Sequence, residues 1–111
     1  MCSKNRYKLE NNSDFETINS FKILISNIKA LKDKTWGCPW QKIQSHISLI
    51  PFLYEESNEL IDAIYEKNAD NICEELGDLL LQVMLHAEIG YEKKEKVSLE
   101  KAQPFWENIK N

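Results

Sequence analysis

Four acidic residues form two equally spaced pairs in the middle of the chain. Glu56 and Glu59 are three residues apart, and Glu75 and Asp78 are also three residues apart. If each pair lies on a helix, its carboxylates share one face, with Cβ atoms about 5–6 Å apart. Each pair can then present two carboxylates to a single point, an arrangement that can hold a cation.

The short connection between the pairs predicts that they face each other. Two helices joined by a short turn pack as an antiparallel hairpin. With the turn centred near residue 67, Glu59 lies at the level of Glu75. Glu56 then lies at the level of Asp78. The sequence therefore predicts two rungs of facing carboxylates, about 4.5 Å apart along the hairpin at 1.5 Å per residue.

The chemistry of four converging carboxylates favours a hard divalent cation. Such groups repel one another and raise each other's pKa unless a positive charge neutralises them. Magnesium is often bound by a few carboxylates while it keeps waters and phosphate oxygens as its other ligands. We therefore expect Mg²⁺, with Mn²⁺ as a substitute. The alternative is an acidic face exposed to solvent, because 18 acidic residues among 111 produce some such pairs by chance.

Other metal and nucleophile chemistries fit the sequence less well. A di-iron bundle uses Glu-x-x-His motifs, and neither His46 nor His86 follows a glutamate at that spacing. Zinc needs clusters of cysteine or histidine, whereas the cysteines at positions 2, 38 and 73 show no CxxC spacing. Phosphate-loop and serine-nucleophile patterns are missing. We assign no role to His86.

Amphipathic periodicity predicts the first of the helices that must position the acids. It follows a capping box of the S-x-x-E form at residues 13–16 and ends near Asp33. Residues 34–44 interrupt the pattern and are expected to form a loop. Because buried aromatic side chains usually pack, one interpretation is that Trp36 and Trp40 plug the end of a helical bundle.

Two further helices carry the acidic pairs. One starts near Ser45 or Ser48 and continues to about residue 67, with Pro51 in its first turn, where a missing N–H is tolerated. The next runs from about Asn71 to at least Ile89. Residue 90 is a glycine. The helix either ends there or continues past it, and a glycine inside a helix costs about 1 kcal/mol of stability.

The expected architecture is a single all-α domain. Ser98 is expected to cap a last short helix that Pro104 interrupts. Residues 1–12 show no periodicity and are expected to form a flexible leader, followed by one domain over residues 13–111. A helical hairpin alone buries too little surface to be stable. We therefore expect a small helical bundle, of the four-helix kind, that oligomerisation completes.

Composition and charge limit the class of protein. Three glycines and three prolines are few turn-forming residues for a many-stranded sheet. The net charge of -4 argues against a general nucleic-acid partner. The odd number of cysteines suggests free thiols in a reducing compartment. No secretory signal and no apolar run that could span a membrane is visible, so we expect a cytoplasmic protein without a membrane partner.

Three segments resemble the motifs of the MazG family of nucleoside triphosphate pyrophosphohydrolases. Residues 36–45 (WGCPWQKIQS) are similar to the GCPWDxxQT stretch of that family. Residues 51–59 (PFLYEESNE) are similar to its EExxE motif. Residues 75–78 (ELGD) match its ExxD motif and are followed by a similar LLLQV run. The three motifs occur in order and at the family's spacing, and the resemblance covers about residues 20–95.

The resemblance implies an all-α hydrolase that cuts nucleoside triphosphates between the α and β phosphates, giving a monophosphate and pyrophosphate through a metal-activated water. It implies Mg²⁺ ligands at the same four acids that the spacing selects: Glu56, Glu59, Glu75 and Asp78. Glu55 is implied as a catalytic residue that orients the water or a ligand, whereas Trp40 and Lys42 are implied as contacts to base and phosphate. Family members are similar in being oligomers, so a homodimer or homotetramer is expected.

Two departures from the family pattern leave other functions open. Position 41 is Gln where the family often has Asp, and no arginine follows Arg6, although MazG domains usually continue into a basic stretch that contacts the substrate. Phosphate charge would then be met by a neighbouring subunit or by lysines near the end of the chain: Lys93, Lys94, Lys96 and Lys101. The alternatives are a hydrolase narrowly specific for dUTP or another phosphoanhydride, and a non-catalytic helical protein that dimerises.

Overall fold

The computed structural model describes residues 11–107, and all the regular structure in this range is helical. The three long helices are α1 (Asn12–Leu31), α3 (Ile50–Glu66) and α4 (Ala69–Glu92). The short elements are α2 (Pro39–Lys42), α5 (Leu99–Ala102) and the 3₁₀ turn η1 (Gln103–Phe105). The expected all-α class is therefore confirmed. None of the helices described is long and apolar enough to cross a membrane.

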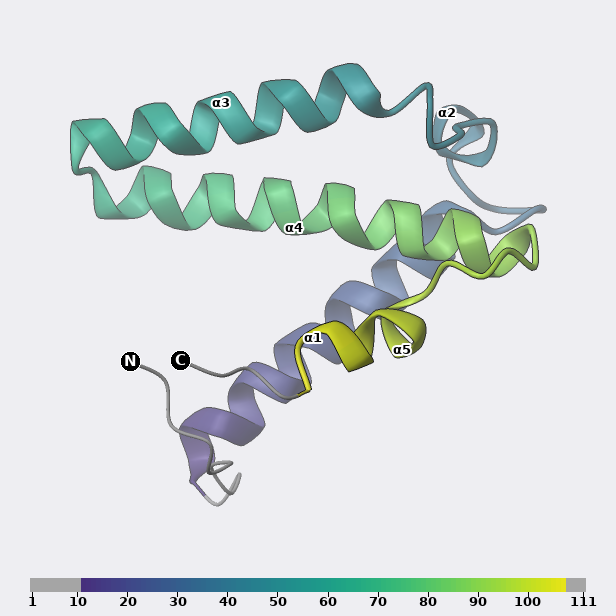
Figure 1. Cartoon of the computed structure of the whole chain (residues 1–111), viewed down its shortest axis with the longest axis horizontal. Helices are drawn as coiled ribbons and strands as arrows, with labels where there is room; N and C mark the ends of the chain where they lie inside the picture. Colours follow the sequence, from purple (N-terminus) through teal and green to yellow (C-terminus); the bar gives the residue numbers. More distant parts are fainter. Residues whose placement is uncertain (1–10, 108–111) are drawn as a thin grey trace.

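Helices α3 and α4 form an antiparallel hairpin (Figure 1). Lys67 ends α3 in the left-handed conformation, with φ of 58°. The side chain of Asn68 then caps α4 by accepting a hydrogen bond from the backbone N–H of Asn71 at 3.1 Å. Because these two residues form the whole connection, the register of α3 against α4 is fixed within the turn, as the sequence predicted.

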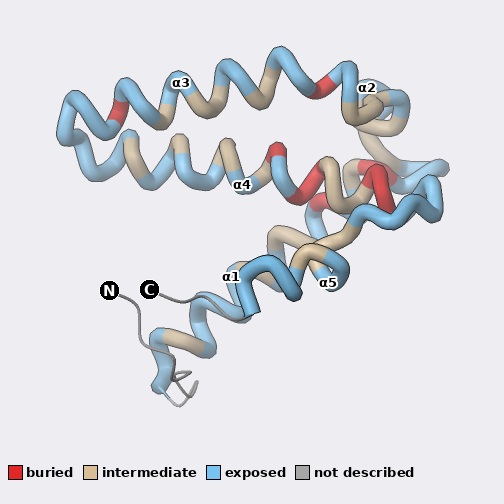
Figure 2. Tube along the Cα trace, viewed as in Figure 1, coloured by how far each residue is buried: buried red, intermediate tan, exposed pale blue. Residues whose placement is uncertain are grey.

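Helix α1 packs against α4 near the C-terminal end of both helices and diverges from it toward the N-terminus (Figure 1). The buried side chains of the hydrophobic core gather where α1, the start of α3 and the second half of α4 meet (Figure 2). They are Ile28, Leu49, Met84, Leu85 and Ile89. The half of the hairpin that carries the four acids extends beyond this core.

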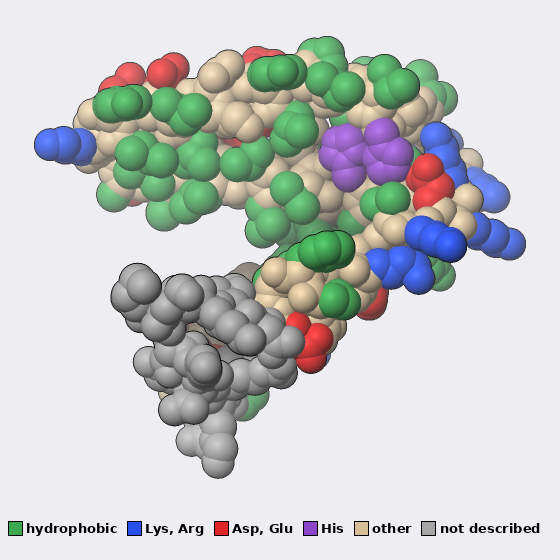
Figure 3. Space-filling model, in the orientation of Figure 1, with side chains coloured by type: hydrophobic (Ala, Val, Ile, Leu, Met, Phe, Trp, Pro, Cys, Tyr) green, Lys and Arg blue, Asp and Glu red, His purple; other side chains and the backbone are tan. Residues whose placement is uncertain are grey.

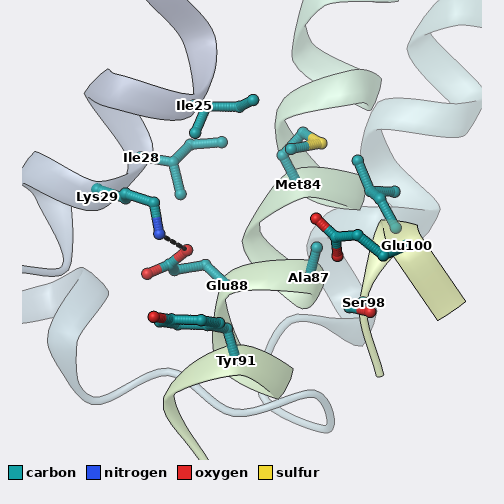
Figure 4. A pocket seen from close by; sticks show the side chains of 10 residues that line it. Ile25, Ile28, Lys29, Met84, Ala87, Glu88, Tyr91, Ser98 and Glu100 are labelled. Atoms are coloured by element: carbon teal, nitrogen blue, oxygen red, sulfur yellow. Dashed lines mark hydrogen bonds and ion pairs between the residues drawn. The ribbon is translucent and has the colours of Figure 1, made fainter. Parts of the chain in front are cut away.

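Polar contacts close the joint between α1 and α4. Lys29 Nζ lies 3.2 Å from Glu88 Oε2 and 4.5 Å from the centre of the Tyr91 ring. These three side chains line a pocket of about 170 Å³ between α1, α4 and the start of α5 (Figure 4). Lys32 is buried, and its Nζ lies 3.7 Å from Glu92 Oε2. The angle of α1 against α4 is thus set by packing and by two ion pairs.

The first helix begins earlier than the capping box predicted. Asn11, not Ser13, is the N-cap, and its Oδ1 accepts a hydrogen bond from Asp14 N at 2.9 Å. Asparagine is among the best N-cap residues. Asn11 lies two residues before Ser13, so the helix that it caps begins two residues earlier than predicted. Residues 1–10 of the predicted leader lie outside the described range, but Asn12 already belongs to α1.

The other helix boundaries agree more closely with the sequence. Helix α3 begins at Ile50, slightly later than expected, and Pro51 lies in its first turn as predicted. Helix α4 passes Gly90 and ends at Glu92. The predicted cap at Ser98 is also confirmed, because its side chain accepts a hydrogen bond from Lys101 N at 3.1 Å.

The tryptophan-rich loop is more ordered than expected and contains α2. Trp36 is 89% exposed, so the interpretation that both tryptophans plug the bundle is wrong for this residue. Asp33 Oδ1 accepts hydrogen bonds from the backbone N–H groups of Thr35 and Trp36. This turn reverses the chain and leaves Trp36 on the outside. Trp40, by contrast, packs edge-on against Phe52.

Candidate metal centre

The two expected rungs of carboxylates are present on the hairpin. Glu56 and Glu59 lie on α3, and Glu75 and Asp78 lie on α4. Each of the four offers one carboxylate oxygen, and these oxygens all lie within 4.8 Å of one another. The two-residue turn produces this convergence because it places each α3 acid opposite an α4 acid.

Burial and mutual repulsion change the acidity of this group. Burial, a hydrogen bond to Glu59 and the charges of Glu59 and Asp78 raise the pKa of Glu75 to about 7. Burial and the same two charges also raise the pKa of Glu56. In addition, Glu56 Oε2 and Glu75 Oε2 are buried without a hydrogen-bond partner. Unpaired buried oxygens destabilise a protein, and a bound cation supplies the missing interaction.

The donor set fits a hard divalent cation. All four donors are carboxylate oxygens, which Mg²⁺ and Mn²⁺ prefer, and no sulfur or nitrogen ligand is part of the group. The oxygens lie within 4.8 Å of one another, which is twice a calcium–oxygen distance of about 2.3–2.6 Å and somewhat more than twice a magnesium–oxygen distance of about 2.0–2.1 Å, so magnesium would draw the four side chains slightly closer together. The convergence of the four oxygens and the two unpaired oxygens among them favour cation binding over the alternative of an acidic face exposed to solvent.

The remaining candidates lie around the carboxylates rather than among them. Glu55 is exposed on α3, and it is not one of the four converging acids. Trp40 is 43% exposed on α2. Lys42 is half-buried, and its Nζ donates a hydrogen bond to the carbonyl of Lys34 at 3.0 Å. The structure thus groups the four acids and leaves the roles of these three residues as predictions.

Two polar features escaped the sequence analysis. Gln82 is only 8% exposed, and its Oε1 has no hydrogen-bond partner. It follows Asp78 by one helical turn, so a polar residue within the apolar LLLQV run was the available signal. The second feature is a contact between His46 and His86, whose Nδ1 atoms are 2.7 Å apart. No spacing pattern connects residues that are 40 positions apart.

Known proteins match the part of the chain that contains these features. The sequence profile of the MazG nucleotide pyrophosphohydrolase domain matches residues 44–104, which include all four acids and both histidines. A nucleoside triphosphate pyrophosphohydrolase/pyrophosphatase MazG of Thermotoga maritima is 51% identical over 73 residues, which cover 66% of this chain and 28% of that protein. The nucleoside triphosphate pyrophosphohydrolase of Escherichia coli is 37% identical over 76 residues, covering 68% of this chain and 29% of that protein.

A third relative is the uncharacterized protein YabN of Bacillus subtilis, which is 57% identical over 54 residues, 49% of this chain and 11% of that protein. The chain thus spans less than a third of the length of each of these three relatives. The domain profile, however, covers more than half of the 111 residues. This chain therefore belongs to the MazG nucleotide pyrophosphohydrolase domain family.

Proposed function

We propose that this chain is a magnesium-dependent nucleoside triphosphate pyrophosphohydrolase, with Mn²⁺ as an alternative ion. The observation that carries the proposal is the convergence of four carboxylates, two of which have buried and unpaired oxygens. The names of the Thermotoga maritima and Escherichia coli relatives describe the same activity. The substrates are nucleoside triphosphates, cleaved between the α and β phosphates.

The residues of the chain supply binding and orientation for this reaction. The four acids hold the ion between α3 and α4, and their negative charge would otherwise repel a triphosphate. Bound magnesium neutralises phosphate charge and makes an attacking water more acidic. The water oxygen would form a bond to the α phosphorus and give up its proton to solvent, while the bond from that phosphorus to the bridging oxygen breaks and pyrophosphate leaves. Glu55, exposed beside Glu56, is the candidate to orient the water.

Substrate contacts beyond the phosphates are assigned to the loop before α3. Trp40 has about two fifths of its surface exposed, which leaves an aromatic face available to a base. Lys42 Nζ donates one hydrogen bond to the Lys34 carbonyl. Its ammonium group has three N–H donors, so two remain for contact with a phosphate.

The apolar surface supports a homodimer or homotetramer. Leu76, Leu80 and Val83 share one face of α4, and each is at least 40% exposed. Hydrophobic side chains cover much of the visible face of the hairpin (Figure 3). Leu80 also lines an open groove of about 650 Å³ against Phe21 and Leu24 of α1. Contiguous exposed apolar surface of this kind is characteristic of an interface.

Sedimentation tests the assembly. We expect the wild-type chain to sediment as a dimer or tetramer and Leu80→Asp to sediment as a smaller species. The control is Ile43→Asp, which also places a charge on an exposed apolar position but lies in the loop before α3. A folded wild-type monomer at micromolar concentration would contradict the assembly without touching the catalytic proposal.

A panel of nucleoside and deoxynucleoside triphosphates tests the activity. We expect magnesium-dependent release of pyrophosphate from several of them. Cleavage of dUTP alone would instead support the narrow alternative, and no cleavage of any substrate would support a non-catalytic protein. Glu59→Gln and Asp78→Asn should each lose activity at least about 100-fold, because a metal contributes several kcal/mol to such a barrier. Glu66→Gln, an exposed acid at the end of α3, is the matched control and should retain activity.

A further inference from the structure

His46 and His86 connect the segment before α3 to the second half of α4 (Figure 3). Their Nδ1 atoms are 2.7 Å apart, and the ring planes differ by only 3°. The ring centroids, however, are 5.0 Å apart. So long a centroid separation beside so short a nitrogen contact places the rings edge to edge, which is the geometry of an N–H···N hydrogen bond rather than of face-to-face stacking.

This hydrogen bond contains one shared proton, and a neighbouring acid determines its direction. A neutral histidine has one donor and one acceptor nitrogen, whereas a charged histidine has two donors. His46 Nε2 lies 3.0 Å from Glu95 Oε1, so this nitrogen carries a proton that the carboxylate accepts. In the neutral pair His46 Nδ1 is therefore the acceptor and His86 Nδ1 is the donor.

Full protonation of the pair is incompatible with this contact. If both rings were charged, two N–H groups would face each other across 2.7 Å, and the hydrogen bond would be lost. An extra proton on the His86 side would also lie on Nε2, which is buried without a partner. The link can therefore exist in the neutral or singly charged pair but not in the doubly charged one.

The other charged groups of the neighbouring elements are engaged elsewhere. Lys32, after α1, lies 3.7 Å from Glu92 Oε2 of α4, and its Nζ also donates a hydrogen bond to the carbonyl of Gln41 at 2.9 Å. Lys42 of α2 donates to a backbone carbonyl. Helix α3 has no acidic residue in its first turn. Glu95 is therefore the charged group that contacts the pair, and Lys93, at the end of α4, is exposed to solvent.

The segment that His46 anchors is a hydrogen-bonded unit. Gln44 Nε2 donates to the carbonyl of Trp40 at 2.8 Å, and Ser48 Oγ donates to Gln44 Oε1 at 2.7 Å. Ser45 N and Ser48 Oγ are also hydrogen-bonded, at 2.8 Å. These hydrogen bonds join Trp40, Gln44, Ser45 and Ser48, which lie on both sides of His46 in the chain. Leu49, which follows directly, is fully buried and keeps the start of α3 in the core.

We propose that His46 and His86 are positioning residues. Their one-proton link, together with the contact of Trp40 with Phe52 and the hydrogen bond from Lys32 Nζ to the Gln41 carbonyl, holds residues 40–48 against α4, and protonation of both rings loosens this segment. The link itself follows from the geometry of the two rings. Its consequence for substrate rests on the proposed function, in which Trp40 contacts the base. Because Leu49 remains in the core, release is local and the helical fold persists.

The release occurs on the acid side of the ordinary histidine range. Burial, followed by the charge of His46, lowers the pKa of His86. A histidine with a lowered pKa contributes stability that is complete above its unfolded value of about 6.5 and is lost as pH falls below it. The segment is therefore held at neutral pH and becomes free in mild acid.

Nuclear magnetic resonance of the ¹⁵N-labelled full chain, without substrate, tests the link directly. At pH 7.5 we expect His86 to be the Nδ1–H tautomer and His46 the Nε2–H tautomer. At the acid pH at which the ¹⁵N shifts show both rings to be charged, amide protection from hydrogen exchange over residues 40–48 should fall at least about tenfold. Protection over residues 17–24 of α1, which lie away from the loop before α3 and from Glu75, should not change.

Two variants of His86 separate positioning from simple packing. In His86→Asn the side-chain amide can donate to a neutral His46 or accept from a charged one. Its protection over residues 40–48 should therefore stay high at the same acid pH. His86→Leu has no polar atom and should show low protection at both pH values. If the chain hydrolyses nucleotides, the KM of the wild type should rise in acid while its kcat stays the same. The KM of His86→Asn should not rise.

Three results would overturn the proposal. Two Nε2–H tautomers at pH 7.5 would exclude the hydrogen bond. Unchanged protection over residues 40–48 of the wild type at the acid pH would exclude the release. If His86→Asn lost as much protection over residues 40–48 in acid as the wild type does, protonation of the second histidine ring would be excluded as the cause of the release. None of these measurements depends on turnover, so failure of the proposed activity would be seen separately in the nucleotide panel.

Discussion

Trp40 meets Phe52 edge-on, with ring centroids 5.2 Å apart and ring planes at 88°. This contact attaches the loop before α3 to the first turn of that helix. Trp36 lies four residues earlier in the same loop and is 89% exposed. One tryptophan of the pair thus contributes to packing, while the other leaves its ring in solvent.

This difference predicts unequal costs for the two tryptophans. An edge-to-face aromatic pair contributes about 0.5–1.5 kcal/mol beyond the area that it buries. We therefore expect Trp40→Ala to lower the free energy of unfolding by about 1–3 kcal/mol. Trp36→Ala should change it by no more than about 0.5 kcal/mol, as for an ordinary surface substitution. Urea unfolding of both variants at one protein concentration checks this, and equal losses would contradict the packing difference.

Magnesium should stabilise the chain through the four carboxylates. A ligand that binds only the folded state, at about 100 times its Kd, adds about 2.7 kcal/mol. We expect the Tm of the wild type to rise by several degrees with magnesium at pH 8. Glu75→Gln should be more stable than the wild type without metal, because one repelling charge is gone, and it should lose most of the magnesium effect. Glu66→Gln should respond as the wild type does.

The raised pKa of Glu75 predicts how stability without metal depends on pH. Its carboxyl has a pKa of about 7 in the folded chain, against an ordinary value of 4.5. The folded state therefore binds this proton more tightly than the unfolded state. The associated stability is fully present below about pH 4.5 and is lost as pH rises through about 7.

Comparison with Glu75→Gln isolates this effect from that of other titrating groups. The free energy of unfolding of the wild type, minus that of the variant, should fall between pH 5 and pH 8 when both are measured by urea unfolding in a chelator. A difference that does not change with pH would mean that the Glu75 carboxyl is already ionised in acid. Added magnesium should reverse the loss at pH 8, since the cation replaces the proton as the neutralising charge.

The sequence was sufficient to predict the hairpin and the group of four acids because both depend on local rules. Helical periodicity assigns Glu56 and Glu59 to one face, and a two-residue turn determines which residues of α4 lie opposite. The acidic group could be predicted for the same reason, although the unpaired oxygens of Glu56 and Glu75 appear only when the side chains are packed.

What the sequence could not predict depends on contacts between distant segments. The angle of α1 follows from its packing on α4 and from the pairing of Lys29 with Glu88. The link between His46 and His86 needs the loop before α3 to reach the second half of α4. Even the cap of α1 was missed, because Asn11 and Ser13 offer competing side chains and their geometry decides between them.

The two glycines of α4 provide a last prediction because their surroundings differ. Alanine is favoured over glycine inside a helix by about 1 kcal/mol. A Cβ built on Gly77 meets no atom within 4 Å, so Gly77→Ala should gain about this amount. A Cβ on Gly90 would lie 2.7 Å from Val97 Cβ and even closer to the Val97 carbonyl oxygen. Gly90→Ala must displace backbone after α4, so we expect a net loss of about 1–3 kcal/mol.

Thermal and urea unfolding of the two variants, at equal protein concentration and without metal, checks the signs. Gly77 lies between Glu75 and Asp78, so magnesium-dependent stabilisation should also be measured in Gly77→Ala. It should equal that of the wild type, because the added methyl group points into open space and leaves both acids on the same helical face. A gain in stability for Gly90→Ala would show that the segment around Val97 yields easily. The end of α4 would then be held by its hydrogen bonds, such as that from Glu95 N to the Gly90 carbonyl, rather than by close packing.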